Sequence, residues 1–171
     1  FYTSLVDRTI FVLLRAMGTA APAGAVIWLL GNITVQGVNL AQHISNFLDP
    51  FGWLLGLDGV IILAYIIAIP ANEIVVPTML MVYMGVGMMT EMPDYSALKT
   101  LLVDQHGWTL LTAVNLMLFA LLHNPCGTTI ATIYKETGSR KWAALSVVIT
   151  LGLAFLVTFL TASLARLLGW A

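Results

Sequence analysis

Four side chains in this sequence have the chemistry of metal ligands and lie close together in pairs. Asn72 and Glu73 are adjacent, and His123 precedes Cys126 by three residues. Thiolate, imidazole and carboxylate groups all bind borderline divalent transition-metal cations. A mixed set of this kind, completed by backbone carbonyls, holds a cation less tightly than a cage of four cysteines or three histidines. Moderate affinity suits a cation that must enter a site and leave it again.

Each of these residues also has a structural interpretation that needs no metal. A lone cysteine such as Cys126 is often a small buried residue. Glu73 can stabilise the positive end of a helix dipole, and Asn72 is a typical N-cap residue. The ring of His123 can hydrogen-bond a backbone carbonyl that Pro125 leaves without its usual partner.

Both pairs lie where a proline interrupts an apolar stretch. Ile69–Pro77 reads IPANEIVVP between two apolar runs, and HNPCG (123–127) follows a third. Proline lacks an N–H and clashes with the preceding turn, so a helix breaks or kinks at each point. Inside a membrane the freed carbonyls must find a partner or line a wet cavity. Paired interruptions are typical of transporters whose site lies between discontinuous helices.

The composition is typical of a helical membrane protein. Hydrophobic residues make up 60% of the 171 residues and charged residues only 9%, against roughly a quarter in soluble domains. The net charge of −1, without a basic cluster, argues against a nucleic-acid partner. The single cysteine excludes an internal disulfide framework. We therefore predict an all-α, polytopic membrane fold with two discontinuous transmembrane helices.

Polar stretches divide the chain into three segments. Residues 1–50 are expected to hold an N-terminal span and a short surface helix over Asn39–Leu48. Residues 51–107 hold the first interruption (69–77) and a polar loop, and residues 108–171 hold the second interruption and a long final span. Asp58, in GLDG (56–59), is interpreted as a helix N-cap, with a place on an ion path as the alternative. The hydroxyls of three threonines are expected to bond carbonyls one turn back: Thr128, Thr129 and Thr132.

The number of membrane crossings depends on how Phe51–Ile69 is interpreted. As one span of about 19 residues it is close to the ~20 that a bilayer requires, and the chain then crosses five times. Alternatively, only Val60–Ile69 is helical and forms one broken span with Ile74–Met89, which gives four crossings. Five crossings place the basic residues near the N-terminus and in Lys135–Lys141 on one side, and the acidic stretch Thr90–Gly107 on the other. We prefer five.

Long stretches around both interruptions are similar to a known family. They are GLDGVIILAYIIAIPANEIVVP (56–77), PANEIVVPTMLMVY (70–83) and HNPCGTTIATIYKETGSRKWA (123–143). They resemble the C-terminal half of the membrane domain of ferrous iron transport protein B, FeoB. The last stretch is long and specific, with Pro-Cys followed by Thr-Thr and by Lys-Glu-Thr-Gly-Ser. The likeness runs from about Phe51 to Leu168.

The resemblance implies a multi-pass protein of the bacterial inner membrane that takes up Fe²⁺. The cation would pass between half-helix ends, with Cys126, Glu73, Asn72 and His123 as ligands along the path rather than as a stable site. This chain would correspond to the family's second gate region and C-terminal region. It would work with the first gate half, the GTPase domain, the lipid bilayer, small accessory Feo proteins and further copies of itself.

The resemblance also implies that the chain is not an enzyme and has no cofactor of its own. GTP would act only through the GTPase domain, and this chain has no GxxxxGK[ST] motif.

Other functions fit the same features. Gate-type repeats resemble those of nucleoside transporters, so the cargo could be a nucleoside or another divalent metal. In a non-transporting membrane assembly module the interruptions would serve only helix packing. A distant third alternative is an intramembrane Cys-His hydrolase built on His123 and Cys126, for which no orienting partner or oxyanion site can be read.

Overall fold

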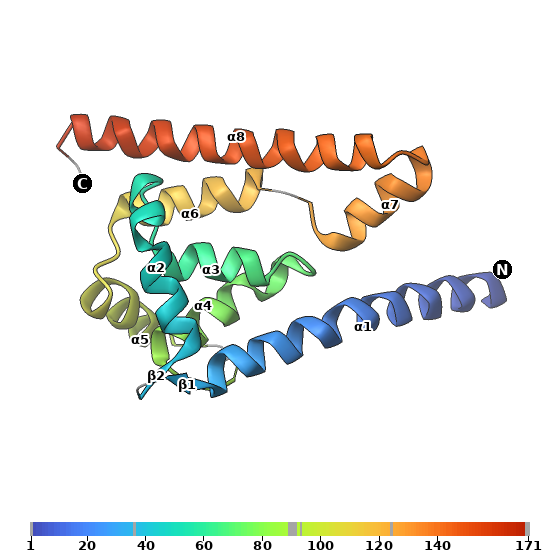
Figure 1. Cartoon of the computed structure of the whole chain (residues 1–171), viewed down its shortest axis with the longest axis horizontal. Helices are drawn as coiled ribbons and strands as arrows, with labels where there is room; N and C mark the ends of the chain where they lie inside the picture. The colour runs from blue at the N-terminus through green and yellow to red at the C-terminus, as the bar shows by residue number, and fades with distance from the viewer. Residues whose placement is uncertain (1, 36, 89–91, 93, 124, 170–171) are drawn as a thin grey trace.

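The computed structural model describes residues 2–35, 37–88, 92, 94–123 and 125–169, and its elements are almost all helical (Figure 1). In chain order they are α1 (Tyr2–Asn32), β1 (Thr34–Val35), β2 (Val38–Asn39), α2 (Leu40–Leu54), α3 (Gly59–Ile67), the 3-10 helix η1 (Asn72–Ile74), α4 (Val75–Met84), α5 (Tyr95–Lys99), the π-helical η2 (Thr100–Gln105), α6 (Leu110–Leu122), α7 (Gly127–Thr137) and α8 (Arg140–Leu167). β1 and β2 form a two-residue antiparallel ladder. The all-α class is therefore confirmed, with this small hairpin added.

The hydrophobic core is centred on α3 and α4, which lie side by side (Figure 1). All residues of α3 except Ile66 are buried, as expected of a helix that is apolar all round. α4 contributes Met79, Leu80 and Met81 to the same core. α4 therefore returns along α3 instead of continuing it, so Val60–Ile69 and Ile74–Met89 do not form one straight path across a bilayer.

A sharp bend separates α2 from α3. The two helices differ in direction by 107°, so the expectation of one continuous span over Phe51–Ile69 is wrong. The preferred count of five membrane crossings depended on that span. The short surface helix over Asn39–Leu48 is also wrong in extent, because α2 continues through Pro50 to Leu54.

Local features at the bend explain why the helix does not continue. Gly56 follows the end of α2 with φ +68°, a conformation that favours glycine. Asp58 then starts α3, since its Oδ1 accepts the N–H of Ile61 at 2.8 Å. The Tyr83 hydroxyl donates to the other carboxylate oxygen of Asp58 and accepts from the Trp108 indole at 2.9 Å. The capping interpretation of Asp58 is therefore confirmed.

The long helices lie along one axis of the molecule. Among the described residues, Leu110–Thr137 and Arg140–Leu167 are long and apolar enough to cross a membrane, and α2–α3 would add a third span if counted as one. α8 packs along α6 and α7 (Figure 1). The start of α1 and the α7–α8 junction lie at one end of the molecule, and α5 and the end of α8 lie at the other.

Asn115, to which no motif pointed, is a fully buried polar residue of α6. Its Nδ2 donates to the carbonyl of Leu55 at 2.7 Å and to that of Thr158 at 3.3 Å. The hydroxyl of Thr161 donates to its Oδ1 at 2.5 Å. One amide thus joins α6 both to α8 and to the residue that follows α2.

We expect Asn115→Leu to lower the free energy of unfolding by about 1–3 kcal/mol, because leucine leaves the buried carbonyl of Leu55 without this donor. Thermal unfolding of the detergent-solubilised protein measures the effect. The matched control is Asn46→Leu, the same chemical change at an exposed position of α2. Equal loss of stability in both variants would show that the Asn115 network contributes nothing.

Candidate functional site

The two proline-containing interruptions meet in space. The backbone N–H of Gly127, at the start of α7, donates to the carbonyl of Ile69 at 2.9 Å. A Cβ on Gly127 would lie 3.8 Å from the Cα of Pro70. Segments far apart in the sequence are therefore joined by a direct backbone contact.

The first interruption leaves a polar atom without a partner. Pro70 has no N–H, and the chain turns tightly here, with the N–H of Ala71 bonded to the carbonyl of Ala68 at 3.0 Å. Asn72 lies inside η1, whose N-cap is Ala71, so its expected role as an N-cap is wrong. Within the described part of the chain, Oδ1 of Asn72 is buried and accepts no hydrogen bond. A buried oxygen without a hydrogen bond destabilises the folded protein unless another group binds it.

Glu73, the next residue, is exposed. It lies in the first turn of η1, two residues before α4 begins. The positive end of a helix stabilises a carboxylate at such a place. This position fits the structural interpretation of Glu73, and its role as a ligand stays a prediction.

At the second interruption Cys126 is the N-cap residue of α7, where it was expected to open a half-helix. The residue is half-buried, and its Sγ lies 3.0 Å from Oγ1 of Thr128 and 3.2 Å from Oγ1 of Thr129. Thr132 bonds the carbonyl of Thr128 one turn back at 2.9 Å, as predicted. The hydroxyls of Thr128 and Thr129 lie close to the thiol, a contact that was not predicted from the sequence. The carbonyl one turn before Thr128 belongs to residue 124, which lies outside the described residues.

His123 ends α6 and lies just before the second interruption. Its Nδ1 is 2.9 Å from the carbonyl of Ala120 and 3.1 Å from that of Phe119. Its ring also packs on Tyr65, with centroids 4.8 Å apart. A neutral ring that donates from Nδ1 leaves Nε2 as the basic nitrogen, the arrangement common in metal-binding histidines. His123 can therefore satisfy the helix end and still present a ligand nitrogen.

These residues do not form a closed metal cage. Among the described residues, no group of three or more His, Cys, Asp or Glu side chains is placed to hold a metal ion. What the structure brings together is the backbone junction of Ile69 and Gly127, flanked by Asn72 and Cys126. Such a set offers a thiol and amide oxygens, which suits brief contact with a cation better than permanent binding.

Comparison with known proteins adds to this geometry. Residues 13–140 match the family described as Gate, nucleoside recognition. A protein named Fe(2+) transporter FeoB from Staphylococcus aureus (strain MSSA476) is 31% identical over 85% of this chain, and one from Leptospira biflexa is 29% identical over 75%. The chain belongs to the FeoB family of Gate proteins. Its matched region is a membrane gate region and not an enzyme domain.

The FeoB relatives are much longer than this chain. It spans 22% of the length of the Staphylococcus aureus protein and 19% of that of the Leptospira biflexa protein. A third relative, from Porphyromonas gingivalis, is named a fusion of Fe(2+) transport protein A with Fe(2+) transporter FeoB and is 28% identical over 62% of this chain, which spans 13% of it. The comparison with solved structures gives no significant match.

Proposed function

We propose that this chain forms part of the path by which a FeoB transporter moves Fe²⁺ across the bacterial inner membrane. The cation passes where the end of α3, η1 and the start of α7 meet. Asn72 and Cys126 are its principal side-chain ligands there, and His123 and Glu73 are ligand positions on either side. The segment α3–η1–α4 acts as a helical hairpin that turns back at Pro70, and α6–α7 acts as a discontinuous membrane helix. The open helix ends at the two interruptions supply carbonyl oxygens.

The observation that carries this proposal is the buried Oδ1 of Asn72, which accepts no hydrogen bond from the residues that the structure describes. It lies three residues after Ile69, whose carbonyl receives the N–H of Gly127. A passing cation would bind this oxygen and would also offset the negative charge of the Cys126 thiolate. The hydroxyls near Sγ at 3.0 and 3.2 Å can donate to that thiolate between passages. The site thus favours a cation without trapping it.

The orientation follows from the distribution of charge. Lys135, Arg140 and Lys141 lie around the α7–α8 junction, at the same end of the molecule as the start of α1 (Figure 1). We place this end in the cytoplasm, following the positive-inside rule. The end with α5 and η2 then faces outward and receives the cation first.

The rest of the transporter lies outside the matched region, since the chain spans only 22% of its Staphylococcus aureus relative. We propose that the remainder supplies the other gate half and a GTPase domain, which is the only place where GTP acts. The fusion named in Porphyromonas gingivalis favours an Fe(2+) transport protein A as an accessory partner. Contacts between further copies of the chain complete the assembly.

Transport of a nucleoside is the second candidate, because the matched Gate family is described as nucleoside recognition. Competition separates the two cargoes. A hundredfold excess of mixed nucleosides should leave Fe²⁺ uptake by the full-length transporter unchanged, whereas excess Mn²⁺ or Co²⁺ should compete for the same ligands. Inhibition by nucleosides alone would favour the second candidate.

Fe²⁺ uptake by full-length transporter in intact cells tests the proposed ligands. We expect Asn72→Leu and Cys126→Ser each to lower the initial rate about fivefold at matched membrane abundance, because each removes roughly 1 kcal/mol of contact with the cation. Thr132→Val is the control, since its hydroxyl bonds only the carbonyl of Thr128 among the contacts described here. Unchanged rates in both ligand variants, with lowered abundance alone, would overturn the proposal in favour of an assembly module.

A further inference from the structure

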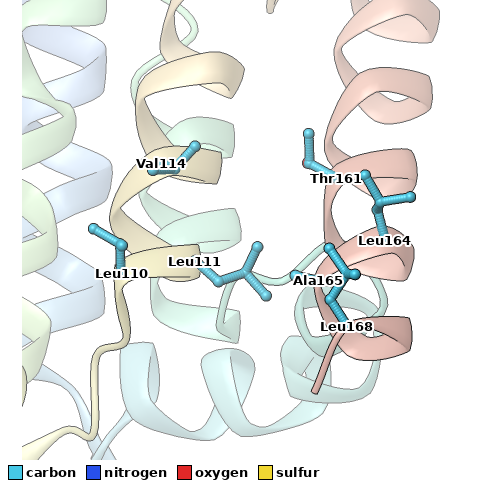
Figure 2. A pocket seen from close by; sticks show the side chains of 7 residues that line it. All are labelled: Leu110, Leu111, Val114, Thr161, Leu164, Ala165 and Leu168. Carbon is cyan, nitrogen blue, oxygen red and sulfur yellow. The ribbon is translucent and has the colours of Figure 1, made fainter. Parts of the chain in front are cut away.

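An apolar groove runs between α6 and the last turns of α8, with a cavity of about 590 Å³ (Figure 2). Its walls include Leu110 and Val114 of α6 and Leu164 and Leu168 of α8 and its end, and Leu111 points from α6 toward α8. Leu110 and Leu164 are strongly exposed, at 75% and 61%. Thr161 lies on the wall, but its hydroxyl is used inside the protein by Asn115. The groove thus offers a hydrocarbon surface shaped as a slot.

A second cavity of about 270 Å³ adjoins the groove and has a different chemistry. The two cavities share Leu111 as a lining residue. The second is lined by Arg166 and by Thr109 and Thr112, whose hydroxyls lie 3.2 Å apart. Trp53 forms another part of its wall. An apolar groove therefore lies next to a smaller, partly polar chamber that carries a cation, with Leu111 in the wall of both.

The charge of Arg166 is not neutralised within the described part of the chain. Its guanidinium stacks over the ring of Trp53 at 3.9 Å and donates to the Trp53 carbonyl. Asp58 follows Leu57 in the wall, but its carboxylate accepts from Ile61 and Tyr83. A guanidinium has five N–H donors in a planar fork that fits phosphate oxygens. Charge complementarity therefore calls for an anion in the polar chamber.

The positions of the two cavities along the membrane normal fit the polar head group and the hydrocarbon chain of one lipid molecule. Arg166 lies in the last turn of α8, at the end of a helix of 28 residues that is long enough to span a membrane. Tryptophans such as Trp53 are typical of the membrane–water interface. The chamber thus lies at head-group level, and the groove beside it runs toward hydrocarbon depth.

We propose that this double cavity binds one anionic phospholipid, with the phosphodiester at Arg166 and an acyl chain in the groove between α6 and α8. Basic pockets between membrane helices bind anionic head groups in this way. The bound lipid would fasten the end of α8 to α2 and to the start of α6, on the opposite side of the molecule from the junction of the two interruptions.

The test measures thermal unfolding of the full-length transporter in nanodiscs of phosphatidylcholine alone and with phosphatidylglycerol added. We expect phosphatidylglycerol to stabilise the wild type and Arg166→Gln to weaken its apparent affinity about fivefold or more. Arg166→Lys, which keeps the charge but loses the fork, should lie between the two. Arg140→Gln, at the exposed opposite end of α8, is the control and should keep the full preference.

A second variant separates the head group from the chain. Ala165→Phe fills the groove without changing charge and should also weaken the stabilisation by phosphatidylglycerol, while inorganic phosphate alone should not stabilise the wild type. Each comparison is between lipids for one variant, so a general loss of stability cancels. The proposal is overturned if the wild type responds equally to both lipids, as it would with a further membrane helix covering the groove. It is also overturned if Arg166→Gln keeps the preference, if Ala165→Phe has no effect, or if phosphate alone reproduces the stabilisation.

Discussion

Replacement of Gly59 by alanine is expected to cost at least about 3 kcal/mol and to remove most of the folded protein from the membrane. Gly59 is the first residue of α3, at its crossing with α2. An added Cβ would lie only 1.9 Å from the carbonyl oxygen of Ser45 and 2.8 Å from the backbone N of Asp49. Both are backbone atoms of α2, so the clash is relieved only by moving the two helices apart. That movement would open the core of which α3 is the centre.

The abundance and thermal stability of full-length transporter in detergent measure this effect. Gly152→Ala is the matched control, because Gly152 lies within α8 and an added Cβ meets nothing within 4 Å. Alanine there should be neutral or slightly stabilising, since it favours the helix. If Gly59→Ala were as stable as Gly152→Ala, the close crossing of α2 and α3 would be refuted.

Replacement of Gly127 by proline is expected to lower Fe²⁺ uptake about tenfold or more while α7 still forms. Gly127 is the first residue of α7, where proline fits a helix. Cys126 before it already has φ −60° and ψ 159°, which the residue preceding a proline prefers. Proline therefore removes the N–H that the carbonyl of Ile69 accepts. Losing that bond weakens the junction by about 1–3 kcal/mol, or roughly 5- to 150-fold in the population of the joined state.

Gly127→Ala is the control for this variant. It keeps the N–H, and its Cβ would meet the carbonyl oxygen of Ile69 at 3.7 Å, an ordinary contact. Uptake is compared at equal membrane abundance, so that transport is separated from folding. Wild-type uptake by Gly127→Pro would show that the contact between the two interruptions has no part in transport, although Asn72 and Cys126 could still be ligands.

Features that depend on a few neighbouring residues were predicted correctly from the sequence. The helices α3 and α6 end shortly before Pro70 and Pro125, because proline removes a donor whatever surrounds it. That these ends form two discontinuous membrane helices stays a prediction. Asp58 caps α3 and Cys126 precedes α7, because the bonds and torsions of a helix start involve residues only two or three positions apart. The helical membrane class followed from composition alone.

Features that depend on contacts between distant segments were missed or predicted wrongly. Phe51–Ile69 has the length and composition of one span, yet the crossing of α2 with α3 at Gly59 requires a bend there. No motif pointed to Asn115, because its partners come from α8 and from the residue after α2.

The composition determined by itself that this protein is helical and rich in apolar segments, and the prolines determined where α3 and α6 end. Only the tertiary structure decided that α4 returns along α3 and that Ile69 and Gly127 meet. It also decided that Asn72 is not an N-cap and that its buried Oδ1 has no hydrogen-bond donor among the described residues. The physical reason is the range of the forces involved. Helix breaks arise from torsions and hydrogen bonds within one turn, whereas the meeting of two breaks depends on how apolar surfaces from the whole chain are buried together.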